Sequence, residues 1–265
     1  AVGLGCLERG QALCVHGTGS FVDVLTGTKL PAHDAAHESS LTMTARRMGG
    51  VSRYAIETYV PTTGSALNWI CEKLQWFDNP QQISALAREA ETPADLVFIP
   101  ALTGLRLPAM EPGARASISG VSMATSRPQL ARSILEGIAH SVASCVQADE
   151  AASGTEVGEL LVGGGLSGSD ALLQIQADLG GLPVRRLADT DKASLRGVAF
   201  MAGSAGLLWD GLEQACATLR TEAVFTPRMA ADERGERRRI WRARVGDELA
   251  RARAPGRSAA LEGCA

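Results

Sequence analysis

Short apolar runs alternate along the chain with longer stretches that place apolar residues at helical spacing, a pattern typical of an α/β fold. The runs predict strands in 12–25 (two strands with a turn between them), 53–59, 96–99, 117–121, 160–162 and 184–187. The periodic stretches predict helices from Thr62 or Thr63 to about Phe77, over 82–91, from about Pro128 to Gln147, after Gly165, over 193–208 and over 233–250. Residues 101–120, rich in Gly and Pro, predict a long ordered loop of the kind that is usually functional.

The central stretch runs from Glu159 to Leu182, where an apolar strand meets a helix through the three glycines Gly163–Gly165. We expect Ser167 and Asp170 to form a capping box at the start of that helix, and Gly180-Gly181 to end it. Glycine at the end of a strand lets a ligand lie against the backbone, and the helix N-terminus offers free N–H groups. A tight connection without a ligand would have the same pattern, so both interpretations stay open at this point.

A second glycine turn, Gly17-Thr18-Gly19, separates the two strands expected in 12–25. The tip of such a hairpin can present backbone N–H groups and the Thr18 hydroxyl in a concave nest that suits phosphate oxygens. A plain hairpin turn is the alternative interpretation of the same residues.

The composition argues against some classes of partner. Charged residues make up 21% of the chain, hydrophobic residues 45%, and the net charge is -3, so neither a nucleic-acid-binding nor a membrane-binding surface is expected. No apolar run reaches the roughly 18 residues of a membrane-spanning helix. A group of arginines near the C-terminus is expected to form a solvated helix face, because no apolar or aromatic residue interleaves them: Arg234, Arg237, Arg238 and Arg239.

The cysteines and histidines show neither a disulfide framework nor metal-ligand spacing. Because the cysteines are scattered and several lie in apolar runs, we expect free, buried thiols in a reducing compartment, which favours the cytoplasm. These cysteines are Cys6, Cys14, Cys71, Cys145, Cys216 and Cys264. The chain begins at Ala1, without an initiator Met and directly in apolar sequence, so we expect a cut end.

Four ordered motifs together resemble those of one protein family. The run Ala116-Ser117-Ile118-Ser119-Gly120-Val121, followed by Gln129-Leu130 and then Ser133-Ile134-Leu135-Glu136, resembles the C-terminal signature of the FGGY family of carbohydrate kinases. HGTGSF at 16–21 precedes this signature and VGGGLSGSDALLQ at 162–174 follows it, in the order that the family has. With GSALNW at 64–69 and PALTGL at 100–105, the chain is most similar to the members that phosphorylate glycerol.

The resemblance implies an α/β fold of the actin-like ATPase (ribonuclease H-like) type, with a mixed sheet flanked by helices. Kinases of this kind have two such domains and bind ATP, with Mg²⁺, and the acceptor in the cleft between them. Residues 1–253 are similar to the C-terminal domain alone, and 254–265 are expected to be a disordered tail. The N-terminal kinase domain is therefore an expected partner, and the face it would cover is expected to drive self-association into a homo-oligomer.

The resemblance also assigns residues to the ligands. ATP or ADP is expected at Gly17, Thr18 and Gly19 (phosphates), Gly64 and Asn68 (ribose and phosphates), and Gly164, Gly165 and Ser169 (adenosine). Phe21 is expected to face the acceptor. The general-base Asp of the family would lie upstream of Ala1, so the chain is expected to hold no catalytic residue and no metal ligand, and to be inactive alone.

Three functions are compatible with these motifs. The first is ATP-dependent phosphorylation of glycerol or a related polyol, with this chain as the nucleotide-binding half. The second is the same reaction on another acceptor, such as xylulose, ribulose or gluconate. The third is a non-catalytic module that binds nucleotide.

The chain departs from the glycerol-specific pattern at three places. Ser169 stands where that pattern has a longer amide side chain, so base recognition is expected to be looser or mediated by water. Ala109-Met110 replace aromatic residues and alter the floor of the loop. His16 replaces an aromatic residue beside the hairpin tip, and we expect a structural strand histidine there rather than a phosphate-binding cation.

Overall fold

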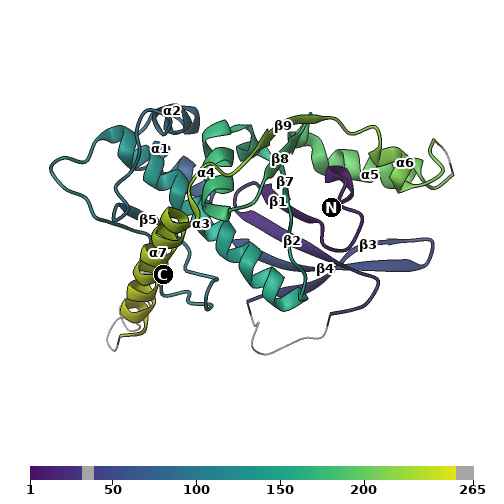
Figure 1. The fold of residues 1–265 in the computed structure, drawn as a ribbon, viewed down its shortest axis with the longest axis horizontal. Helices are drawn as coiled ribbons and strands as arrows, with labels where there is room; N and C mark the ends of the chain where they lie inside the picture. Colours follow the sequence, from purple (N-terminus) through teal and green to yellow (C-terminus); the bar gives the residue numbers. More distant parts are fainter. Residues whose placement is uncertain (32–38, 207, 255–265) are drawn as a thin grey trace.

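The computed structural model describes residues 1–31, 39–206 and 208–254 (Figure 1). The strands are β1 (Ala12–His16), β2 (Ser20–Gly27), β3 (Leu41–Met48), β4 (Val51–Val60), β5 (Val97–Ile99), β6 (Ser117–Ser119), β7 (Leu160–Gly163), β8 (Val184–Leu187) and β9 (Thr221–Phe225). The α-helices are α1 (Gly64–Glu72), α2 (Pro80–Leu86), α3 (Arg127–Ser153), α4 (Asp170–Gly180), α5 (Ala193–Gly203), α6 (Leu212–Cys216) and α7 (Ala231–Arg253). Short 3-10 helices are η1 (Val2–Leu4), η3 (Gly165–Gly168) and η4 (Thr190–Lys192).

Seven strands form one mixed sheet in the order β3-β4-β2-β1-β7-β8-β9. The β1–β7 and β7–β8 pairs are parallel, and the other neighbours are antiparallel. Central strands of a sheet covered on both faces read as continuous apolar runs, and β1 and β7 do so because both of their faces are buried. The predicted mixed sheet flanked by helices is thus confirmed.

Different elements cover the two faces of this sheet. On one face, Val22 of β2 and Val162 of β7 pack with Val142 of α3 and Leu173 of α4. On the other face, Leu13 and Leu25 pack with Leu4 of η1 and Ala193 of α5. Figure 1 shows α3 and α4 beside the sheet, with α5 and α6 at the end that holds the N-terminus.

A third apolar cluster joins α1 and α2 to α3 and α4. Leu67 and Ile70 of α1 and Ile83 of α2 pack against Ile134 of α3 and Leu172 of α4. This cluster holds α1 against α3 and α4, which cover the sheet. The N-terminus of α1 consequently lies next to the hairpin tip between β1 and β2, where the glycine motifs predict a site.

The helix that follows β7 begins differently from the prediction. Ser167 does not cap it, because its hydroxyl donates to the Gly164 carbonyl within η3. Ser169 is the N-cap of α4 instead, and its side chain accepts from the Leu172 N–H at 3.2 Å. The predicted stop is confirmed, since α4 ends at Gly180 and Gly181 takes the left-handed conformation with φ 72°.

The boundaries of other helices were predicted less well. α1 ends at Glu72 rather than near Phe77, because the backbone reverses at Gln75 with φ 56°. α2 occupies Pro80–Leu86 rather than 82–91, since the Asn79 side chain caps it and Pro80 fits its first turn. α3 continues beyond Gln147 to Ser153, and α5 ends at Gly203.

The prediction of a solvated arginine face on α7 is wrong for three of its four residues. Arg238 donates to the Leu179 and Gly180 carbonyls at 2.8 and 2.7 Å and so satisfies the C-terminal end of α4. Arg237 lies 3.7 Å from the buried Glu136 carboxylate, and Arg234 packs beneath Gly181. Arg239 alone of the four is largely exposed and pairs with Glu236.

The sequence pattern missed β3, β9 and α6 altogether. The predicted free, buried thiols are confirmed for Cys6, Cys14, Cys71 and Cys145, and Cys216 is free but only partly buried. Cys264 and the predicted tail beyond Ala254 lie outside the described residues. Within the described ranges, no helix combines the length and the apolar character needed to cross a membrane.

Candidate nucleotide site

At the base of the hairpin tip between β1 and β2, the backbone packs so closely against neighbouring backbone that only glycine fits. The Gly17 N–H donates to the Gly19 carbonyl at 2.8 Å, which closes the turn. A Cβ on Gly19 would lie 2.5 Å from the Val60 carbonyl oxygen and 2.9 Å from that of Pro61. The tip is therefore pressed against the end of β4.

The N-terminus of α1 is hydrogen-bonded to this tip. The Gly64 N–H donates to the Gly17 carbonyl at 3.2 Å, and the Ser65 N–H donates to the Thr18 carbonyl at 3.1 Å. A Cβ on Gly64 would lie 2.4 Å from the Gly17 oxygen, so this contact also requires glycine. The tip carbonyls are thus engaged, while Thr18 is exposed and its N–H and hydroxyl form no hydrogen bond with any described residue.

The glycine turn after β7 completes the arrangement. Gly164 has φ 85°, donates to the Thr190 carbonyl at 3.2 Å, and lies so close to β1 that a Cβ would meet the His16 oxygen at 2.2 Å. Gly165 by contrast is exposed, with nothing within 4 Å of where its Cβ would be. The close approach of Gly164 to β1 places Gly165 beside the hairpin tip.

These three turns share one open cavity of about 440 Å³, which we call the cradle. Five of the residues predicted to bind nucleotide line it: Gly17, Thr18, Gly64, Asn68 and Gly165. Gly19 and Gly164 do not line it, and their role in the structure is to permit the close backbone contacts described above.

Two further predicted site residues, besides Gly19 and Gly164, lie outside the cradle lining. The Ser169 hydroxyl caps α4 and lies 2.7 Å from the Ser84 hydroxyl, so it is already engaged within the protein. Phe21 is 42% exposed and stacks on Tyr59, with 5.3 Å between the ring centroids. The assigned contacts of both residues with ligand stay predictions.

The structure adds cradle residues that the motifs did not identify. Ser65, Trp69, Glu72 and Lys73 of the α1 region line the cavity, as does Leu166. Helical spacing could have found Ser65 and Glu72, because they lie three and four residues from Asn68 and share its side of the helix. The cradle therefore carries one cationic and one anionic side chain at its α1 edge.

His16 is a structural histidine that ties the hairpin to α1. Its Nδ1 lies 2.8 Å from the Ser20 hydroxyl, and its Nε2 lies 2.9 Å from Gln176 Oε1. The Ser20 hydroxyl donates in turn to Thr63, the N-cap residue of α1, at 2.9 Å. Burial lowers the pKa of His16 to about 4, so the ring is neutral at pH 7 and is not the cation that phosphate would attract.

The cradle has the features of a site for phosphate and ribose groups. Close backbone contacts at Gly19, Gly64 and Gly164 support it, its rim carries the exposed N–H and hydroxyl of Thr18, and its volume is within the usual range for ligand sites. A metal site is a different matter. The described part of the chain has no group of three or more His, Cys, Asp or Glu side chains that could hold a metal ion.

Comparison with known proteins identifies the family. The model of the FGGY family of carbohydrate kinases, C-terminal domain, matches residues 12–206. The chain belongs to this family. Two of its relatives are glycerol kinases, one from Rhizorhabdus wittichii, 35% identical over 249 residues, and one from Thermus brockianus, 37% identical over 245 residues. These alignments cover 94% and 92% of the chain but 48% of each relative, so this FGGY chain spans about half the length of the curated relatives that it matches.

Solved structures agree with this assignment. The glycerol kinase of Plasmodium falciparum with ADP superposes with a TM-score of 0.84 at 28% identity, over 94% of this chain and 49% of that one. Xylulose kinase from Lactobacillus acidophilus superposes with a TM-score of 0.78, over 96% of this chain and 50% of that one, and at 21% identity it shows the fold alone. The fold is that of the actin-like ATPases, as predicted.

Proposed function

We propose that this FGGY domain is the nucleotide-binding half of an ATP-dependent kinase that phosphorylates a hydroxyl of glycerol or a related polyol. The observation that carries the proposal is the meeting of three glycine turns, far apart in the sequence, in one cradle. The 35–37% identity to glycerol kinases and the ADP of the Plasmodium falciparum structure support the choice of acceptor and nucleotide.

We assign the contacts within the cradle as follows. The exposed N–H and hydroxyl of Thr18, with the Gly17 backbone, would hold the terminal phosphates. Gly64 and Asn68 would contact the ribose and phosphates, and the turn at Gly164 and Gly165 would lie against adenosine. ATP when bound supplies the γ-phosphoryl group. Ser169 is proposed to contact the adenosine side through water, because its hydroxyl already caps α4.

Mg²⁺ is proposed to bind the nucleotide phosphates and carboxylates supplied from outside this chain. The ion characteristically uses one or two carboxylates together with substrate phosphates and keeps several waters. The general base is assigned to the other half of the enzyme, where it would contribute about 10²–10⁴-fold to the rate. We therefore propose that this chain binds nucleotide weakly and does not phosphorylate glycerol alone.

The surface for the other half is proposed on the sheet face that carries Phe21. Leu41 and Met43 of β3 stand opposite Glu57 and Ala55 of β4 and are 42% and 41% exposed, and Phe21 stands opposite Tyr59. Directly opposed residues share a face, so these exposed apolar side chains lie on one face of the sheet, in a patch that also contains Glu57. Without the other half, the patch is expected to associate with a second copy of the chain. The buried free thiols favour a reducing location such as the cytoplasm.

Calorimetric titration with MgATP, together with a phosphorylation assay, tests the proposal. The chain alone is expected to bind MgATP without converting glycerol, and the complete protein is expected to prefer glycerol over xylulose, ribulose and gluconate. A preference for another of these acceptors would replace glycerol in the proposal. Nucleotide binding by a complete protein that phosphorylates none of them would favour a non-catalytic module.

A further inference from the structure

A second cavity, of about 820 Å³, lies between the end of β4, the loop 104–110, α3 and α7. We call it the arginine cavity. It is larger than the cradle and shares no lining residue with it. The long loop that the sequence predicted to be functional forms one wall here, and Ala109 and Met110 lie in that wall.

Apolar side chains form most of the body of the arginine cavity. Leu105, Leu107 and Pro108 come from the loop, Val60 from β4 and Val245 from α7. Such surfaces bind the apolar part of a ligand, with a favourable free energy of roughly 25 cal/mol for each Å² of apolar surface that binding removes from water.

The charges in the arginine cavity all have the same sign. Arg106, Arg242 and Arg253 line it, and none of its described lining residues is Asp or Glu. Arg253 has a partner, the Glu111 carboxylate at 3.1 Å. Arg106 and Arg242 form no ion pair within 4.0 Å among the described residues, and their contacts are with neutral groups.

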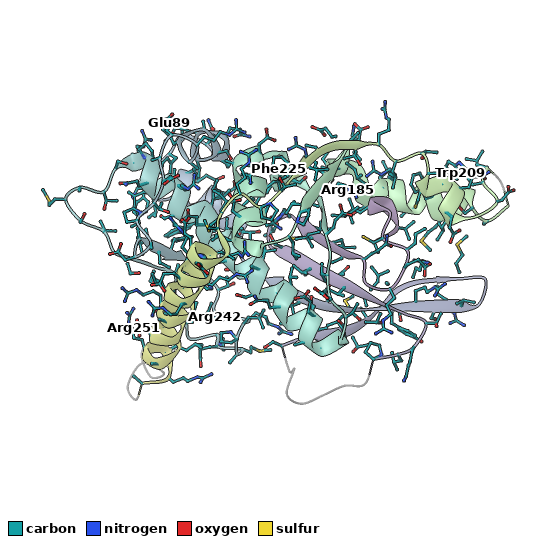
Figure 2. All side chains as sticks on the ribbon, in the orientation of Figure 1. Glu89, Arg185, Trp209, Phe225, Arg242 and Arg251 are labelled. Carbon is teal, nitrogen blue, oxygen red and sulfur yellow. The ribbon has the colours of Figure 1, made fainter. Side chains whose placement is uncertain are left out.

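Those neutral contacts hold both guanidinium groups at the cavity. Arg106 donates to the Ser39 carbonyl at 3.3 Å and lies over the Tyr59 ring, 4.9 Å from its centroid. Arg242 donates to Gln147 Oε1 of α3 at 2.9 Å, on the side of α7 that faces α3 (Figure 2). A guanidinium group that lacks an anion in a partly enclosed apolar cavity is a favourable partner for a carboxylate or phosphate.

We infer that the arginine cavity binds an organic anion with an apolar body, its head group between Arg106 and Arg242 and its body against Leu105, Leu107 and Val245. The volume lies within the 300–1,000 Å³ that is usual for small-molecule sites, and the mixture of an apolar wall with a few polar anchors is characteristic of them.

The arginine cavity adjoins the strand end that supports the cradle. Tyr59, Val60 and Pro61 line it, and three residues further on Gly64 lines the cradle. The Thr62 hydroxyl between them donates to the carbonyl of Pro100, another lining residue. Residues 59–64 thus join the two cavities, and an anion bound here is expected to change nucleotide affinity, a consequence that rests on the proposed nucleotide role of the cradle.

Calorimetric titration of the chain with decanoate, well below its micelle concentration, tests the site itself. Decanoate is expected to bind one site per chain, and decylammonium and 1-decanol, with the same body, are expected to bind at least about tenfold more weakly. Arg106→Gln and Arg242→Gln should each weaken decanoate binding by about 10- to 100-fold. Arg244→Gln is the matched control, because Arg244 is on the same helix, pairs with Asp247 and does not line the cavity, and it should bind like the wild type.

The variant Ala148→Phe on α3 fills the cavity and provides a second test in case the arginine variants fail to fold. It retains every charge, and it should weaken decanoate binding while circular dichroism stays unchanged. No saturable binding to the wild type, equal binding of decylammonium, or equal binding to all variants would overturn the inference. Titration with MgADP in the presence and absence of decanoate tests the coupling, and equal affinities would overturn the coupling alone. Because decanoate binding needs no nucleotide, a failure of the proposed kinase function is distinguishable from a failure of this site.

Discussion

The cradle and the arginine cavity lie on neighbouring parts of one fold, yet they are made from different parts of the polypeptide. The cradle is supported by backbone in close contact at Gly19, Gly64 and Gly164, where no Cβ can be accommodated. The walls of the arginine cavity are side chains from a strand, a loop and two helices, with α7 closing one side. Consequently, substitutions that add side-chain atoms should disturb the cradle, and substitutions that remove them should disturb the arginine cavity.

The largest contrast is expected between two tryptophans. Trp241 of α7 is 5% exposed and stacks on His140 with 5.0 Å between ring centroids, whereas Trp69 lines the cradle and is 36% exposed. Trp241→Ala should lower the free energy of unfolding by about 3–5 kcal/mol, because it leaves a cavity beneath α7. Trp69→Ala should change it by less than about 1 kcal/mol, and denaturant unfolding of both variants measures the difference. Equal losses would mean that α7 does not anchor the arginine cavity.

The two regions should also respond to pH in opposite directions. Burial raises the pKa of Asp149, next to the arginine-cavity residue Ala148, to about 9, whereas His16 behind the cradle has a pKa of about 4. The folded state therefore binds more protons at Asp149 than the unfolded state above pH 3.8, and this contribution to stability is lost as pH rises toward 9. Conversely, the contribution of neutral His16 is lost as pH falls from 6.5 toward 4.

Asp149→Asn separates these contributions. Between pH 5 and 8 the free energy of unfolding of the variant should fall less than that of the wild type, where the fall can reach about 1.4 kcal/mol for each pH unit per group. Below pH 6.5 the variant should still lose the contribution of His16. Urea unfolding at a series of pH values measures both. An unchanged profile on the alkaline side would show that Asp149 is ionised in the folded protein.

Two glycines of the cradle form a matched pair. Gly64→Ala places a Cβ 2.4 Å from the Gly17 oxygen and should cost about 1–3 kcal/mol of stability, as well as separating α1 from the hairpin tip. Gly165→Ala meets nothing within 4 Å and should leave stability within about 0.5 kcal/mol of the wild type. Thermal unfolding distinguishes them, and a stable Gly64→Ala protein would argue against the rigid contact described here.

The smallest contrast concerns two adjacent arginines of α7. Arg238→Ala removes two charged hydrogen bonds to the C-terminal carbonyls of α4 and should cost about 1–2 kcal/mol. Arg239→Ala removes an exposed pair with Glu236, and no measurable change is expected. Denaturation midpoints of the two variants test this, and the reverse order would restore the interpretation of α7 as a solvated face.

The difference between the backbone-built cradle and the side-chain-built arginine cavity also explains which features could be predicted from the sequence. Glycine turns between an apolar strand and its neighbour are local signals, so the hairpin tip and Gly163–Gly165 are recognisable from the order of residues alone. The prediction that these turns meet in one cradle came from the family resemblance. The N-cap of α4 was misplaced by two residues, because Ser167 and Ser169 are equally good caps by type.

Other features depend on contacts that no local pattern contains. Arg238 looks like a surface residue until α4 is placed beside α7, and Arg106 and Arg242 lie far apart in sequence yet line one cavity. β3 was missed although Leu41-Thr42-Met43-Thr44 alternates apolar and polar residues, because it is an edge strand whose residues are mostly exposed. Tertiary packing decides all of these.

Calorimetric titration of MgADP into the wild-type chain and into Gly165→Ala shows whether the three glycine turns together form a nucleotide site. We expect saturable binding to the wild type. The variant should have the same unfolding temperature and an affinity weaker by about tenfold, because the added methyl group enters the open cradle. Absence of binding to a folded wild-type chain, or equal affinity in both proteins, would contradict the proposed nucleotide site.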